Sequence, residues 1–180
     1  MMEKTFVIIK PDAMKKNLVG KIVARFEENS LRVAGMKMVK ADLKLASKHY
    51  PDALGEAIAK KAEKAGVKTK DPKEYGMKIL RWLREFIISY PVVAMVLEGD
   101  DAISRVRKLI GYTDPATAEK GTIRRDFGDD SVLQANIENR PVYNLVHASD
   151  SPETAKHEIS LWFKNDELFR LKPPAESEEQ

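Results

Sequence analysis

The sequence contains no cysteine, and this absence removes several kinds of site at once. Without thiols the chain can form no disulfide bond, use no thiolate as a nucleophile and build no zinc or iron–sulfur site from cysteine ligands. A reducing compartment is compatible with such a composition. The protein is therefore not a disulfide-stapled domain or a cysteine-dependent enzyme.

Long apolar runs and a strong charge of one sign are also lacking. No window approaches the length that crosses a bilayer, and the short apolar run after Met1 has no signal-peptide cleavage pattern. The 31 basic and 28 acidic residues are interspersed and give a net charge of +3. This balance indicates no obligatory nucleic-acid partner, although a local pocket for a small anion is compatible with it. We expect a cytoplasmic protein with no membrane association.

The common phosphate-binding and hydrolase motifs are missing as well. There is no GxxxxGK[ST] and no GxGxxG, and the pair Gly20-Lys21 lacks the upstream glycine of a phosphate-binding loop. No GxSxG and no HExxH occurs either. Any nucleotide chemistry must therefore use another structural device.

The composition that is present predicts one globular domain. Apolar residues make up 43% and charged residues 33% of the 180 positions, and this length can bury a sizeable core. Two prolines and an acidic end follow Leu171. We expect a single domain over residues 1–171 and a mobile tail over 172–180.

Apolar periodicity predicts the secondary structure. Strands are expected over residues 5–9, 31–43, 92–97 and 143–146. Helices are expected over 19–29, 46–50, 52–65, 71–90 and 101–110 and from 151 onward, while 112–140 should form long loops. Two strand–helix–strand units favour an α+β fold. The predicted fold is a ferredoxin-like sandwich, with a four-stranded antiparallel sheet covered by helices and an inserted helical segment.

The octapeptide Asn144–Ser151 holds the most informative residue, His147. It lies between a predicted strand and the first turn of a helix, where free backbone amides favour a negative group. A neutral imidazole there can attack a phosphoryl group and release it again. The alternative is a structural histidine satisfied by Ser149 or Asp150. His49, which precedes Tyr50, is interpreted as structural.

Three separated cations strengthen the phosphoryl interpretation. Lys10 ends the first predicted strand, Arg107 lies on a predicted helix, and Arg124 lies in a loop. Phosphoryl transfer depends mainly on positioning and on charge stabilisation by lysine, arginine and usually a magnesium ion. Lys10 taken alone could equally be a solvated residue at a strand end.

Five segments in chain order carry a resemblance to one family. They are Phe6-Val-Ile-Ile-Lys-Pro-Asp-Ala13, Pro91-Val-Val-Ala-Met-Val96, Thr113-Asp-Pro-Ala116, Gly121-Thr-Ile-Arg124 and Asn144-Leu-Val-His-Ala-Ser-Asp-Ser151. Over about residues 4–169 the chain resembles nucleoside diphosphate kinase, in a form like the archaeal ones. The resemblance implies transfer of the terminal phosphate of a nucleoside triphosphate to a nucleoside diphosphate. It implies a ping-pong mechanism through a phosphohistidine on His147.

The resemblance also assigns roles to individual residues. Glu158 matches the glutamate that orients the catalytic histidine through its other ring nitrogen, Lys10 contributes to catalysis, and Ser149 and Asp150 shape the turn after His147. The nucleotide contacts that it implies are Lys10, Tyr50, Ile79, Arg107, Thr113, Arg124 and Asn144. Mg²⁺ is the implied cofactor; it arrives with the nucleotide phosphates, and no metal site made of protein ligands is expected.

The sequence departs from the family pattern at three places. Ile79 or Leu80 stands where the family usually has an aromatic residue that stacks on the base. Segments of about 51–78 and 128–142 resemble insertions and should alter oligomer contacts or the rim of the cleft. A homohexamer is expected, with the loop 112–122 at the subunit contacts.

A period of two would put Asn144 and His147 on opposite sides of an ideal strand. Because both must reach one cleft, we expect a strand end or a bulge between them. Two competing interpretations remain open. One is a nucleic-acid-binding or regulatory protein that keeps the fold without the activity, and the other is a histidine phosphatase.

Overall fold

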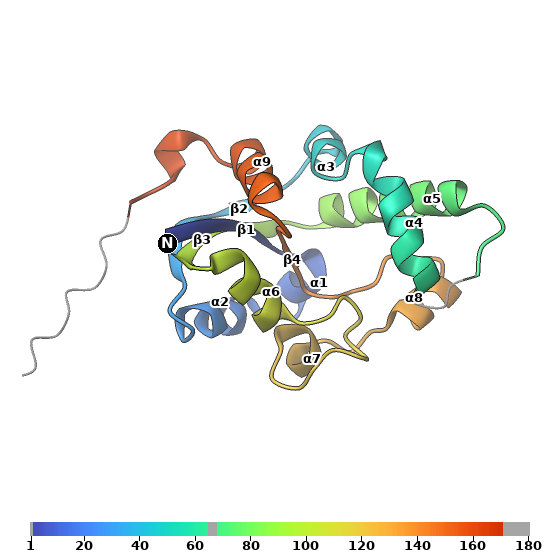
Figure 1. The fold of residues 1–180 in the computed structure, drawn as a ribbon, viewed down its shortest axis with the longest axis horizontal. Coiled ribbons are helices and arrows are strands. Elements are labelled where there is room, and N and C mark those ends of the chain that lie inside the picture. The colour runs from blue at the N-terminus through green and yellow to red at the C-terminus, as the bar shows by residue number, and fades with distance from the viewer. Residues whose placement is uncertain (1, 65–67, 171–180) are drawn as a thin grey trace, which may run out of the picture.

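The computed structural model describes residues 2–64 and 68–170. An antiparallel sheet of four strands lies at its centre in the order β2-β3-β1-β4 (Figure 1). Its strands are β1 (Met2–Ile9), β2 (Arg32–Val39), β3 (Val92–Asp100) and β4 (Val146–Ala148). The long central pair β1 and β3 is in register from Met2 opposite Asp100 to Ile9 opposite Val93. The predicted ferredoxin-like α+β fold is confirmed.

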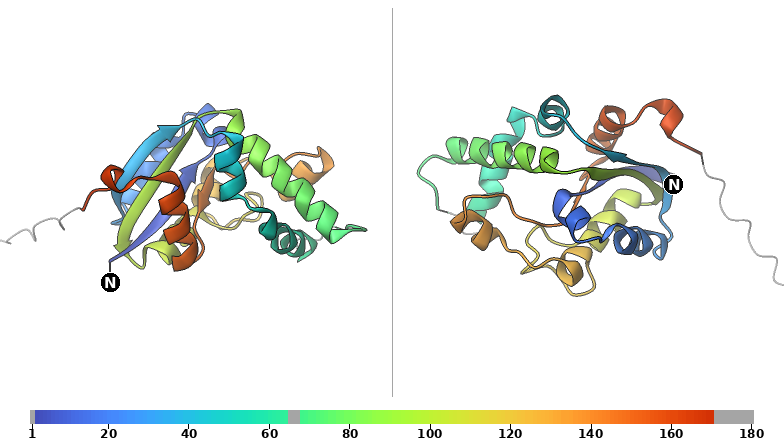
Figure 2. Two further views of the ribbon diagram at one scale, coloured as in Figure 1. Left: turned by 90° about the horizontal axis from the view of Figure 1, so that it is seen from above. Right: turned by 180° about the vertical axis from the view of Figure 1, so that it is seen from behind.

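Helices cover both faces of the sheet (Figures 1 and 2). On one face α2 (Val19–Glu27) and α6 (Ala102–Ile110) pack on Val7, Ile9, Met95 and Leu97. On the other face α3 (Leu43–His49), α5 (Pro72–Ser89) and α9 (Pro152–Trp162) pack on Phe6, Ile8, Ala94 and Val96. Successive strand residues alternate between the two cores, so the central strands are continuously apolar from Phe6 to Ile9 and from Val92 to Leu97.

Local capping explains where the helices begin. The side chains of Asp42, Asp71 and Ser151 each accept a backbone N–H from the first turn of α3, α5 and α9. Proline occupies the first helical position after Asp71 and Ser151, where its missing N–H costs nothing. The cap at Asp42 also explains why the strand predicted over 31–43 stops at Val39.

Three expectations about local structure were wrong. Residues 112–140 are not only loop, because Thr122 and Ser131 cap two short helices, α7 (Ile123–Phe127) and α8 (Val132–Ile137). A short helix, α1 (Pro11–Lys15), follows β1 and was not predicted. The last strand is Val146–Ala148 instead of 143–146, because a turn with a positive φ at Leu145 precedes it.

The segments predicted as insertions form a helical extension beyond the end of the sheet (Figure 2). The first contains the 3₁₀ turn η1 (Asp52–Leu54) and α4 (Gly55–Lys64), which packs closely on α5. The second contains α8, whose Asn136 hydrogen-bonds to Tyr75 of α5, and Asn139 after α8 accepts a hydrogen bond of 2.7 Å from Lys78. The two segments therefore contact each other.

Two predicted boundaries fall outside the described residues. They are the end of the helix expected over 52–65 and the tail expected from residue 172. The last described element is the 3₁₀ turn η2 (Asn165–Glu167). Within residues 2–64 and 68–170, none of the helices has the length and apolar character required to cross a membrane.

Candidate active site

A strained turn before β4 delivers two of the predicted site residues. Leu145 has a positive φ of 67°, and the Val146 N–H donates to the Asn144 carbonyl at 2.7 Å. This is the rarer, strained kind of γ-turn. The Leu145 N–H donates to Asp12 Oδ2, and the Leu145 carbonyl accepts the Lys10 N–H. Because of this turn, the pairing of β4 with β1 begins only at Val146. Asn144 therefore lies outside the strand, which agrees with the strand end expected between Asn144 and His147.

His147 is held through one ring nitrogen only. Its Nε2 lies 2.8 Å from Glu158 Oε1, and Ser149 Oγ donates to Glu158 Oε2 at 2.5 Å. A carboxylate can only accept, so Nε2 carries the proton and Nδ1 keeps its lone pair. None of the described residues hydrogen-bonds to Nδ1, and 22% of the His147 side chain is exposed. The arrangement presents Nδ1 as a nucleophile.

Aromatic residues pack around the imidazole of His147. The rings of His49 and His147 are 4.6 Å apart between centroids and nearly perpendicular, and Phe6 and Tyr50 lie slightly farther away. Trp162 Nε1 donates to His49 Nδ1 at 3.3 Å. Burial, followed by the charges of His147 and Lys10, lowers the pKa of His49 well below its usual value. His49 is therefore a neutral packing partner at neutral pH.

Lys10 and Asn144 form a polar cluster beside the turn. Lys10 Nζ donates to Asn144 Oδ1 at 2.5 Å, and Asn144 Nδ2 donates to the Thr113 carbonyl at 2.8 Å. Burial lowers the pKa of Lys10 to about 8, while the nearby Asp12 carboxylate opposes that shift. Lys10 is therefore a buried cation that an anionic ligand would stabilise, and not a solvated strand end.

Arg124 is fixed by backbone carbonyls. Its guanidinium donates to the carbonyls of Gly111, Asn144 and Val146, at 2.9, 3.1 and 2.7 Å. Burial, followed by repulsion from Arg107, lowers the pKa of Arg124 to about 10, so it remains charged at neutral pH. Arg107 is exposed, and its side chain forms no hydrogen bond or ion pair with the rest of the described chain. Two cations without a paired carboxylate make a site suited to an anion.

Tyr50, which directly follows α3, packs on the same side of the site as His49 and His147. Its ring is buried, and burial together with the Glu158 carboxylate raises its pKa. The phenol therefore stays protonated and can act as a hydrogen-bond donor. Arg84 holds this position by donating to the Tyr50 carbonyl from Nε at 2.9 Å.

The remaining predicted residues differ in how directly they join the cluster. Thr113 contributes through its carbonyl, and its side chain is exposed. Asp150 is exposed, and no hydrogen bond of its side chain occurs among the described residues; Ser151 caps the helix instead. Leu80 is completely buried in the core, whereas Ile79 is half-buried. Of these two, only Ile79 could therefore contact a base.

Sequence reasoning missed three contributors to the site. Asp12 anchors the γ-turn, Trp162 hydrogen-bonds to His49, and His49 itself packs on His147. Asp12 stands in the quoted segment Phe6–Ala13, so its position beside Lys10 was a usable signal. For His49 and Trp162 there was none, because 113 positions separate them along the chain.

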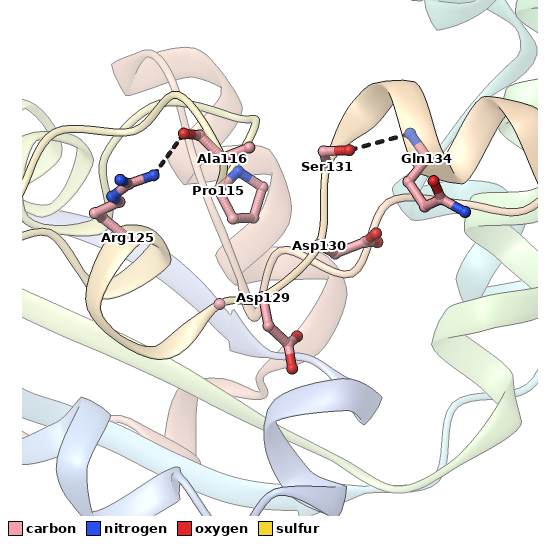
Figure 3. A pocket seen from close by; sticks show the side chains of 8 residues that line it. Pro115, Ala116, Arg125, Asp129, Asp130, Ser131 and Gln134 are labelled. Carbon is pink, nitrogen blue, oxygen red and sulfur yellow. Dashed lines mark hydrogen bonds between the residues drawn. The ribbon is translucent and has the colours of Figure 1, made fainter.

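Two cavities are lined mainly by other residues, although Asp12 also borders the second. One of about 250 Å³ is lined by Pro115, Arg125, Asp129, Asp130 and neighbouring residues (Figure 3). The other, of about 470 Å³, is bordered by Trp82, Phe86 and Tyr143. Neither is lined by any residue of the predicted site.

The residues present fit a magnesium ion that is carried by nucleotide phosphates. Mg²⁺ prefers oxygen ligands, including phosphate oxygens and water. Lys10, Arg107 and Arg124 can bind the other phosphate oxygens. Within the described ranges, the group with metal-binding spacing is His49, His147 and Glu158, whose two nitrogen donors do not suit Mg²⁺.

Comparison with known proteins places this geometry in a family. Residues 3–168 match the family model described as nucleoside diphosphate kinase. A nucleoside diphosphate kinase of Pyrobaculum aerophilum is 42% identical over 179 residues, covering 93% of this chain and 98% of that protein. One of Thermococcus kodakarensis is 44% identical over 167 residues, covering 93% of this chain and 80% of that protein.

Solved structures agree. A crystal structure of an NDP kinase from Pyrobaculum aerophilum superposes with a TM-score of 0.86 at 41% identity, covering 94% of this chain and 100% of that one. A transition-state mimic of the Borrelia burgdorferi nucleoside diphosphate kinase, with vanadate and ADP bound, gives 0.83 at 34% identity, covering 96% and 94%. These similarities do not favour the non-catalytic alternative. The chain belongs to the nucleoside diphosphate kinase family and is a kinase that transfers phosphate between nucleotides.

Proposed function

We propose that the transferred phosphate passes through a phosphohistidine on Nδ1 of His147. The observation that carries this proposal is the asymmetry of the ring, in which Nε2 is bound to Glu158 and Nδ1 has no partner among the described residues. Nδ1 is therefore the nitrogen with an available lone pair. A cluster of buried cations, Lys10 and Arg124, adjoins the same turn.

The reaction then proceeds in two matched halves. Nδ1 attacks the terminal phosphorus of a nucleoside triphosphate, an N–P bond forms, and the bond to the bridging oxygen breaks to release the diphosphate. Glu158 stabilises the positive charge that develops on the ring, because it accepts the Nε2 proton in a hydrogen bond. Lys10, Arg107 and Arg124 offset the negative charge of the phosphoryl oxygens. An acceptor diphosphate reverses these steps.

Three further features belong to this proposal. Mg²⁺, bound to the phosphate oxygens, supplies additional charge neutralisation, and the protein gives it no ligand set of its own.

Ile79 contacts the base in place of an aromatic ring, with Asn144 and Thr113 near the sugar and phosphates. The enzyme works in the cytoplasm as a homohexamer, with the loop 112–122 and its exposed Tyr112 at subunit contacts.

Histidine substitutions test the phosphohistidine. Incubation with a γ-labelled nucleoside triphosphate should place acid-labile label on the wild-type chain. His147→Ala should abolish this label and reduce phosphate exchange by more than a thousandfold, because the nucleophile is lost. His157→Ala is the matched control, since His157 is exposed on α9. Exchange by His147→Ala within tenfold of wild type would contradict the proposal.

A further inference from the structure

His49, His147 and Glu158 converge on one point of the site. One potential ligand atom from each lies within 4.8 Å of the other two. Glu158 Oε1 is 2.8 Å from His147 Nε2 and 3.5 Å from His49 Nδ1. Donors bound to one tetrahedral zinc ion lie roughly 3.3 Å apart, given ligand distances of about 2.0–2.2 Å. Glu158 Oε1 therefore already lies near ligand spacing from both histidines, whereas the two histidine donor atoms, which lie within 4.8 Å of each other, must move closer to share one ion.

The donor set itself is typical of zinc. Two imidazoles and one carboxylate, with a fourth position left open, form a recurrent zinc site. His49 Nδ1 is already unprotonated, because it accepts the Trp162 N–H at 3.3 Å, slightly beyond the usual range. A metal on Nδ1 uses the same lone pair, so it must displace this weak hydrogen bond. Ser149 Oγ holds the other oxygen of Glu158, which fixes the carboxylate from outside the site.

We propose that these three residues bind a divalent transition metal such as zinc, and that the bound metal prevents His147 from accepting a phosphoryl group. The second half of the proposal depends on the proposed role of His147 Nδ1. It would add an inhibitory metal site to the enzyme, distinct from the magnesium that accompanies the nucleotide.

The inhibition follows from the position of one proton. A metal on Nε2 needs the lone pair of that nitrogen, so the Nε2 proton must leave. In a neutral imidazole the proton then occupies Nδ1, and a protonated Nδ1 has no lone pair with which to attack phosphorus. The metal also displaces the hydrogen bond from His147 to Glu158. Binding changes no oxidation state and needs no further reactant.

Cobalt reports binding directly in the wild-type protein. Co²⁺ should bind at one equivalent per chain with the intense visible absorption of four- or five-coordinate cobalt, and Zn²⁺ should displace it. Mg²⁺ should not, because it prefers oxygen ligands. The proposed site would be refuted in the wild-type protein itself by either of two results: no saturable Co²⁺ binding, or an absorption as weak as that of octahedral cobalt.

Matched variants locate the metal. His49→Asn should weaken Co²⁺ and Zn²⁺ binding at least tenfold while circular dichroism confirms the fold, and His157→Asn should leave the affinity unchanged. Wild-type affinity in His49→Asn, or a loss of binding in His157→Asn, would place the metal elsewhere and refute the proposal.

The inhibitory half has its own measurement. Saturating Zn²⁺ should reduce label transfer from a γ-labelled nucleoside triphosphate to His147 at least tenfold, and a chelator should restore it. Unchanged labelling of a zinc-saturated chain would refute the inhibition. Absence of label in the metal-free chain would instead refute the proposed function, so the two failures are distinguishable.

Discussion

Single residues at this site combine burial with charge, and Lys10 shows what that combination does. Its ammonium is buried at the end of β1, where only Asn144 accepts a hydrogen bond from Nζ among the described residues. Burial favours the neutral amine, and a negative ligand favours the ammonium. The charge of Lys10 is therefore coupled to nucleotide binding.

This coupling predicts a pH dependence. Because the pKa of Lys10 is lowered to about 8, the free enzyme loses this cation as the pH rises through 8, and kcat/KM should fall there. The bound nucleotide phosphates raise the pKa again, so kcat should fall only at higher pH. Lys10→Arg should move the alkaline fall of kcat/KM upward. Initial rates against pH check this, and a flat wild-type profile between pH 7 and 9 would contradict it.

Ser149 acts on the catalytic histidine indirectly, through its hydrogen bond to Glu158. Its hydroxyl donates to Glu158 at 2.5 Å and is completely buried. Ser149→Ala leaves that carboxylate with one partner fewer, so we expect kcat to fall about tenfold with little change in KM. Ser160→Ala is the control, because among the described residues its hydroxyl donates only to the His157 carbonyl on α9. Equal rates in the two variants would mean that Ser149 does not position Glu158.

At the scale of elements, the contact between α4 and α5 depends on glycine. A Cβ on Gly76 would lie 2.0 Å from the Gly55 carbonyl oxygen, so α4 could not approach α5 as closely. This explains a glycine inside a helix that alanine would otherwise stabilise by about 0.5–1 kcal/mol.

Alanine substitutions at two helical glycines distinguish the effect of helix propensity from the effect of packing between α4 and α5. Gly76→Ala should lower the melting temperature and expose the amides of α4 to hydrogen exchange, because the two helices must separate. Gly20→Ala, where nothing lies within 4 Å of the new Cβ, should leave stability unchanged or raise it slightly. A stabilised Gly76→Ala protein would show that the contact does not constrain α4.

At the scale of the whole molecule, β2 is an edge strand of the sheet. Its edge is covered only in part, because the Phe169 N–H donates to the Ala34 carbonyl. The side chains of Met36 and Met38 remain 47% and 68% exposed, which is unusual for large apolar side chains on an edge strand. We therefore expect this edge to lie in a subunit contact of the proposed hexamer. A charge at Met38 would be buried there without a partner.

The prediction concerns mass in solution. Wild-type protein should scatter light as six chains, and Met38→Glu should give smaller species. Met2→Glu, at an exposed methionine on β1, is a comparison that should keep the wild-type mass. A Met38→Glu variant of wild-type mass would remove β2 from the interface.

The sequence by itself determined the family and the longer strands and helices, but not the short helices α1, α7 and α8. Period-two and helical patterns, with caps at Asp71 and Ser151 and prolines after them, depend on local chemistry that can be read along the chain. The ordered motifs around Lys10, Arg124 and His147 indicated phosphoryl transfer before any contact was known.

Only the tertiary structure decided which atoms meet. The turn at Leu145 exists because Asp12 and Lys10 bind its backbone across more than 130 positions, and no local pattern specifies a positive φ at leucine. The fit of His49 against His147 and the burial of Leu80 likewise depend on packing between α3, α5, α9 and the sheet. Such contacts arise only when distant segments fold together, because burial and unpaired polar groups are properties of the packed whole.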